Sequence, residues 1–281
     1  MAVSNLLTEA SEFILTEGSD NIALSITPLF FGVATNPSDE GSVTEPQTGL
    51  ALTPPSSMAA NDLVVVFQTA QGGANNDGKA INNDGGQEWT TDNEAGSYSY
   101  VGSPQSVKIY WCIFNGTWDA NHSWDIPNVT GTQAASLQML VFRPHPPPLT
   151  DNPLWGLDQP NSWATYSDPD SPYTVSITGR TPSRDHNISI AYWTSDDDNT
   201  WGSLSGTNWE QTGLSSQYRN SGGTNHSVSF AYLLQDGAAG TNNVAQNQAT
   251  AGPDQGATGI LTFYSYDSAD ILLFSLLGVG K

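Results

Sequence analysis

The chain has 281 residues, only 12% of them charged, and its formal net charge at pH 7 is −21. Such a charge repels phosphate backbones, so nucleic acid is excluded as an expected partner. Cys112 is the single cysteine and has no intramolecular disulfide partner, so the fold must rest on a hydrophobic core. A chain of this length can bury one.

The first residues contain no basic segment, and no run of 18 apolar residues occurs anywhere in the sequence. We therefore expect neither a secretory signal peptide nor a membrane span, and a protein made in the cytoplasm of its host.

An eight-residue repeat occupies the start of the chain. Asn5, Phe13 and Asn21 open its copies, and each copy places two or three apolar residues before a polar, turn-forming segment. This pattern predicts a small β-meander, an arm over residues 1–27. Because so short a ribbon exposes strand edges and has little core, it needs a neighbour. That neighbour is either its own sandwich or another subunit, bound by strand addition through Leu6, Leu7, Phe13, Ile14, Leu15, Ile22 and Leu24.

After the arm, short apolar runs rich in β-branched and aromatic residues alternate with Gly, Asn, Asp and Pro. This pattern predicts an all-β fold built as an antiparallel β-sandwich. The predicted strands are 24–34, 49–54, 62–70, 87–92, 106–114 and 137–144, followed by 173–179, 188–195, 208–213, 227–235, 259–266 and 270–278.

The predicted strands form two parallel series, which indicates an internal duplication. Thr53 precedes Leu63 by the same ten residues as Thr178 precedes Ile188, and a Gly-x-x-Trp segment ends at Trp89 and again later in the chain, at Trp209. We match 106–114 with 227–235, and 135–142 with 269–276. The sequence thus predicts two jelly-roll-like repeats, 28–148 and 149–281, joined by the proline-rich connector 142–155. Separate domains and one shared globule both remain compatible with it.

The arm "NLLTEASEFILTEGSD", the strand "SSMAANDLVVVFQTA" and the late segment "NQATAGPDQGATGILTFYSYDSADILLFSL" resemble β-sandwich structural proteins of tailed bacteriophages. Asn61 departs from that pattern, which has glycine there. The resemblance implies a non-enzymatic virion protein, either a capsid decoration (cement) protein or a tail-associated part. Its partners would be capsid or other virion proteins, including neighbouring copies, and its location the virion, with the capsid surface preferred to the tail.

No catalytic motif supports an enzyme. The string "GSLSG" has Leu204 where a nucleophile elbow needs serine, and we expect it to be a loop; the four histidines share no ligand-like spacing. We therefore expect no cofactor. Acid-rich turns offer calcium-type oxygen ligands, but tight turns require the same residues, so we interpret them as turns. The metal candidates set aside in this way are Asp77, Asp84, Asp196 and Asp198.

An alternative function is glycan binding, as a carbohydrate-binding module or tail adhesin. Flat aromatic side chains in loops can stack on sugars, and Trp118 and Trp201 lie between predicted strands, as does Trp155.

Overall fold

A computed structural model describes most of the chain after the predicted arm. The described residues are 27–38, 47–50, 52, 54–55, 57–71, 81–82, 84–91, 105–119, 123–126, 135–145, 153–167, 173–197, 200–211, 217–220, 226–235, 242–248 and 255–267. Every regular element among them is a β-strand, which confirms the all-β prediction. None of the described residues forms a helix that could span a bilayer.

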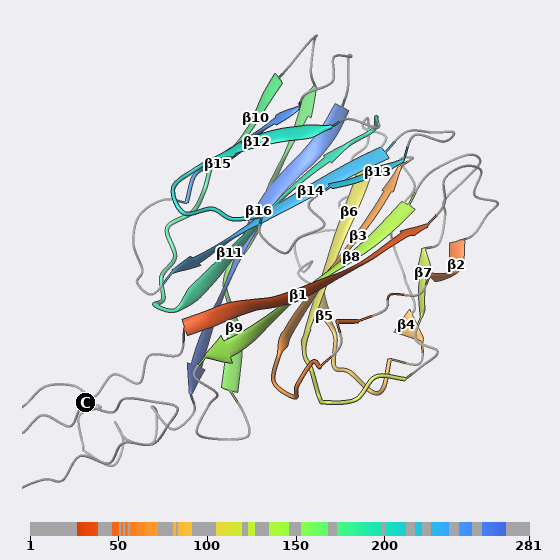
Figure 1. The fold of residues 1–281 in the computed structure, drawn as a ribbon, viewed down its shortest axis with the longest axis vertical. Coiled ribbons are helices and arrows are strands. Elements are labelled where there is room, and N and C mark those ends of the chain that lie inside the picture. The colour runs from red at the N-terminus through yellow and green to blue at the C-terminus, as the bar shows by residue number, and fades with distance from the viewer. Residues whose placement is uncertain are drawn as a thin grey trace, which may run out of the picture.

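The described residues of the first half form eight strands in two sheets (Figure 1). The five-stranded sheet has the order β1-β8-β3-β6-β5, and the three-stranded sheet has the order β2-β7-β4. Their bounds are β1 Thr27–Ser38, β2 Gln47–Leu50, β3 Leu63–Gln71, β4 Ile81–Asn82, β5 Thr90–Thr91, β6 Gln105–Ile113, β7 Ser123–Ile126 and β8 Ala135–His145.

The second half repeats this order strand for strand. Its large sheet is β9-β16-β11-β14-β13 and its small sheet is β10-β15-β12, and pairing of the first strand with the eighth is typical of a jelly roll. The predicted duplicated, jelly-roll-like sandwich is thus the observed fold. The bounds are β9 Pro153–Ser167, β10 Tyr173–Ile177, β11 Asn187–Ser195, β12 Trp201–Ser205, β13 Gln217–Asn220, β14 His226–Gln235, β15 Val244–Gln248 and β16 Gln255–Asp267.

The strand register matches between the halves. Leu63 of β3 lies between Ile113 and Phe142, and its counterpart Ile188 of β11 lies between Leu234 and Phe263. Thr90 pairs with Trp111 where Glu210 pairs with Tyr232. Segment 135–142 therefore corresponds to 256–263 in β16. The predicted match with 269–276 is wrong, and that segment lies outside the described residues.

Several strands were not predicted, above all β9, which begins inside the predicted proline-rich connector. It is a sheet-edge strand, where a proline whose nitrogen faces the open side removes no ladder hydrogen bond. Pro160 lies between Gln159 and Ser162, where the register with β16 shifts. The expected loop "GSLSG" also contains most of β12. Conversely, the expected strand 208–213 contributes an isolated bridge at Glu210.

The two halves share a core, which settles their arrangement as one globule. A central core lies between the two large sheets, and Phe67 of the first half packs there against Tyr192 and Phe230 of the second, at 5.5 and 4.8 Å between ring centroids. A first outer core around Tyr110 and a second outer core around Trp193 lie on the opposite faces of the large sheets. Burial on both faces explains why β3 and β11 carry the apolar runs 63–67 and 190–193.

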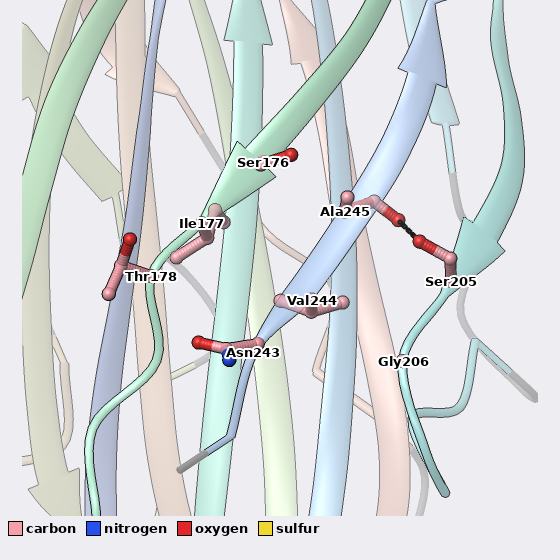
Figure 2. Close-up of a pocket in the computed structure, with 8 residues that line it drawn as sticks. All are labelled: Ser176, Ile177, Thr178, Ser205, Gly206, Asn243, Val244 and Ala245. Carbon is pink, nitrogen blue, oxygen red and sulfur yellow. Dashed lines mark hydrogen bonds between the residues drawn. The ribbon is translucent and has the colours of Figure 1, made fainter.

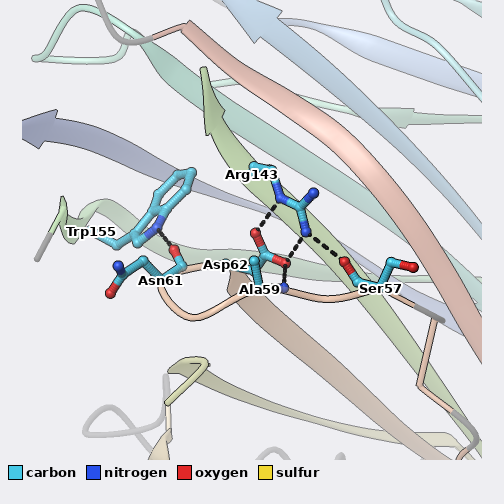
Figure 3. A network of polar contacts seen from close by, with 6 residues as sticks. All are labelled: Ser57, Ala59, Asn61, Asp62, Arg143 and Trp155. Atoms are coloured by element: carbon cyan, nitrogen blue, oxygen red, sulfur yellow. Dashed lines mark hydrogen bonds and ion pairs between the residues drawn. The ribbon is translucent and has the colours of Figure 1, made fainter. Parts of the chain in front are cut away.

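A polar junction ties the halves together beside the central core (Figure 3). Asp62, 1% exposed, accepts hydrogen bonds from Nε and Nη2 of Arg143, both at 2.8 Å, and Arg143 also donates to the Ser57 carbonyl. From the second half, Trp155 donates its indole N–H to the Asn61 carbonyl at 2.8 Å. Hydrogen bonds thus satisfy this buried charge and the carbonyl beside it.

Candidate functional site

A cleft lies at the end of the small sheet β10-β15-β12 (Figure 2). Its central strand, β15, places Val244 opposite Ile177 of β10 and Ala245 opposite Ser205 of β12. The side chains on the outward face are small, so a hollow of about 440 Å³ remains. It is lined by Ser176, Ile177, Thr178, Ser205, Gly206, Asn243, Val244 and Ala245.

A second hollow of about 570 Å³ adjoins the first, and Gly206 and Asn243 line both. Gly206 has φ +137°, and a Cβ there would come within 2.7 Å of the Trp209 ring and 2.9 Å of the Asn243 carbonyl oxygen. Glycine is therefore required at this position by both its backbone angle and its space. The other lining residues are Thr207, Asn208, Trp209, Leu233, Gln235 and Asn242.

Two consecutive asparagines hold the cleft in place. Asn242 is buried and donates through Nδ2 to Ser189 Oγ and Gln235 Oε1, at 2.8 and 2.9 Å. The exposed Asn243 accepts a hydrogen bond from the Gly179 N–H at 2.9 Å, which links the start of β15 to the segment after β10. Among the described residues, Asn243 Nδ2 has no hydrogen-bond partner, so it can donate to a ligand.

The chemistry of the cleft is that of hydroxyls and carboxamides. No side chain in its described lining carries a charge or titrates near neutral pH. The cleft can therefore offer hydrogen bonds to an uncharged polar ligand such as a sugar. Trp209 lies in its wall but is only 8% exposed and packs in the second outer core.

The predicted ligand-binding tryptophans lie elsewhere. Trp201 is 2% exposed and packs in the second outer core, so its assignment as a sugar-stacking loop residue is wrong. Trp155 is likewise buried. Trp118 is half-buried, and its ring centroid lies 5.5 Å from that of Phe114, on which it stacks, and 6.1 Å from that of Trp89. It therefore covers the first outer core.

The acidic candidates that the structure describes are held within turns. Asp84 accepts hydrogen bonds from the Gly86 N–H at 3.0 Å and the Trp89 indole at 2.7 Å. Asp196 accepts one from the Gln255 N–H at 2.8 Å, and burial raises the pKa of the Asp196 carboxyl. Within the described part of the chain, no three His, Cys, Asp or Glu side chains gather into a metal site. Asp77 and Asp198 lie outside it.

The predicted arm residues Leu6, Leu7, Phe13, Ile14, Leu15, Ile22 and Leu24 also lie outside the described residues. The described structure does show where the arm joins the fold. The first strand, β1, begins at Thr27 and forms an edge of its large sheet among the described strands. The arm therefore leads directly into an edge strand.

Sequence reasoning missed the cleft because its residues come from three strands that are distant in the sequence. One signal was available. The duplicated Gly-x-x-Trp segment contains Gly206 and Trp209, which form part of its wall. No family model, curated protein or solved structure matches the chain.

Proposed function

We propose that this protein is a non-enzymatic structural component of a tailed-phage virion, a capsid decoration protein attached through its N-terminal arm. The observation that carries the proposal is the place of β1. It is an edge strand that follows the octad repeat directly, and within the described structure it pairs on one side only, with β8. A strand-forming arm at a sheet edge can extend that pairing into a neighbouring subunit.

The body of the protein suits such a role. Its central core joins the two jelly rolls into one unit, with the small sheets on the outside. A decoration protein stabilises a shell by bridging neighbouring subunits, and a body held together by one shared core can span the contact between them. The sequence resemblance to phage β-sandwich proteins supports the same proposal.

Quantitative peptide mass spectrometry on purified virus particles tests the proposal. A copy number comparable to the major shell protein is expected for a decoration protein. A few copies per particle would instead indicate a tail or vertex, and absence from particles would refute a virion role.

Deleting residues 1–25 separates the arm from the body. The variant keeps every described strand, so we expect it to fold and to lose binding to particles that lack this protein. Binding equal to that of the full chain would exclude the arm as the anchor. A surface variant outside the arm, Ser203→Ala on β12, is a suitable control for handling and expression.

Glycan binding is the second candidate, and the uncharged cleft beside Asn243 favours it. Sugars present hydroxyls, which the amides and hydroxyls of the cleft can bind. Asn243→Ala should then abolish binding to any glycan retained on an array, whereas Trp118→Ala should leave that binding unchanged. An array with no bound glycan would refute this candidate.

A further inference from the structure

Like β1, the strand β9 lies at the edge of its large sheet. Among the described strands it pairs only with β16. Native edge strands are normally protected by proline, charge or bulges. The first part of β9 has such protection in Pro160 and two register shifts, but Ser162–Ser167 contains no proline, no charge and no register shift.

The equivalent stretch of β1 is protected. Pro37 pairs with Ser136 in the first half, as Thr165 pairs with Ala257 in the second. The amide and carbonyl of Ala257 both meet the Thr194 hydroxyl on β11, at 3.1 and 3.2 Å, so they face away from β9. In an antiparallel ladder, the amide and carbonyl of Thr165 then point outward, to the open edge. Pro37 has no N–H to offer at that position, whereas Thr165 has one.

Exposed aromatic side chains flank this edge. Trp163 and Tyr173, 38% and 36% exposed, are the large exposed apolar residues of the described chain. Trp163 is in register with Gly259, between Ala257 and Leu261 of the central core, so it lies on that face of the sheet. Tyr173 stacks on Tyr166, which packs on the second outer core, so it lies on the other face. A strand added here would lie between two aromatic groups.

We propose that the open edge of β9, Ser162–Ser167, pairs antiparallel with the same edge of a second copy, about a twofold axis at Thr165. This arrangement joins the large sheet that contains β9 in one copy to the same sheet in the other copy. It places Trp163 of each copy opposite Ser167 of the other. Each facing pair of outward residues exchanges two backbone hydrogen bonds. Because Ser162–Ser167 is uncharged, the copies meet without opposed like charges despite the net charge of −21.

This proposal does not depend on the virion role. A second copy is favoured over the octad segment as the occupant because that segment is acidic, with Glu9, Glu12, Glu17 and Asp20 and no basic residue, and Ser162–Ser167 offers it no charge to bind. A second copy presents the same uncharged stretch, so pairing between copies needs no oppositely charged partner.

Sedimentation velocity of the full chain tests the proposal. We expect a dimer whose affinity rises with salt, since salt screens the repulsion between the acidic bodies. Thr165→Pro copies the natural Pro37 and should weaken dimerisation by at least about tenfold, because it removes outward hydrogen bonds. Thr165→Val keeps the N–H and should leave the dimer intact. A monomeric wild type, or a dimer unaffected by Thr165→Pro, would overturn the proposal.

A second pair of variants guards against misfolding and identifies the occupant. Ala164→Lys adds a charge at an exposed position of the edge and should also disrupt the dimer, with an unchanged near-UV circular dichroism spectrum. Thr165→Cys should be cross-linked to itself between copies by a short bismaleimide, since Cys112 is only 1% exposed. A Thr165→Pro-sensitive dimer without that cross-link would refute self-pairing of this edge and assign it to another segment.

Discussion

The turns that lead into β3 and β11 are equivalent in backbone but differ in chemistry. Asn61 and His186 occupy the same place and both have positive φ, 79° and 53°. The His186 carbonyl accepts the backbone N–H of Ser265 at 3.2 Å. In the first half the residue equivalent to Ser265 is Pro144, which has no N–H, and the indole of Trp155 supplies the missing donor from the other half.

The next position shows the same contrast. Asp62 forms an ion pair with Arg143, whereas its counterpart Asn187 donates to the Arg184 carbonyl at 3.0 Å. Tyr264 replaces Arg143 and lies under the Arg184 guanidinium, 5.4 Å from the ring centroid. The backbone of a duplicated fold is thus kept while its side-chain contacts are exchanged. In the first half, one of these contacts now joins the two repeats.

The largest effect should come from breaking the core that the halves share. Phe67→Ala removes a fully buried ring that contacts two aromatic residues of the other half, and it should lower the free energy of unfolding by about 3–5 kcal/mol. Urea denaturation should still show one transition by fluorescence and by circular dichroism. Two separate transitions in the wild type would show that the halves are energetically independent.

The second-largest loss of stability should come from breaking the ion pair of the first half. Arg143→Ala leaves Asp62 buried without its cation, and it should cost about 2–4 kcal/mol, less than a fully buried pair because Arg143 is 31% exposed. The double variant Asp62→Asn/Arg143→Tyr copies the second half and should recover most of that loss in the same denaturation experiment. Failure to recover would mean that the two turns are not interchangeable.

The indole hydrogen bond between the halves should contribute less. Trp155→Phe removes the indole N–H that donates to the Asn61 carbonyl and should cost about 1–2 kcal/mol. Adding Pro144→Ser supplies a backbone N–H as in the second half, and thermal unfolding should show a partial rescue. If Pro144→Ser alone destabilises the protein and rescues nothing, the proposed equivalence with Ser265 is wrong.

The smallest expected effect is a loss of stability at alkaline pH. Burial, with Glu210 beside it, raises the pKa of Tyr232 to about 12, whereas the first half has Trp111 at this place. Because the unfolded chain ionises this tyrosine near pH 10, stability falls as pH rises from about 10 through 12. At pH 11 the loss due to Tyr232 is about 1 kcal/mol, and Tyr232→Phe should remove it. Equal slopes of stability against pH in both proteins would contradict the prediction.

The sequence predicted the inner strands well because their environment is simple. β3, β11 and β14 lie in the middle of sheets with both faces covered, so they carry apolar runs bounded by turn residues. Edge strands carry a weaker pattern. β9 and β12 contain glycine and polar residues, and β9 also contains proline, because one side of an edge strand makes no ladder hydrogen bonds.

By itself the sequence determined the all-β class, the duplication and the turns at Asp84 and Asp196, since strand periodicity and turn chemistry are local properties. Only the tertiary structure decided that Trp201 is buried, that the halves share a core, and that Gly206 and Asn243 meet in a cleft. These features depend on which faces of distant strands come together, and side-chain alternation along one strand does not specify its partner across the core.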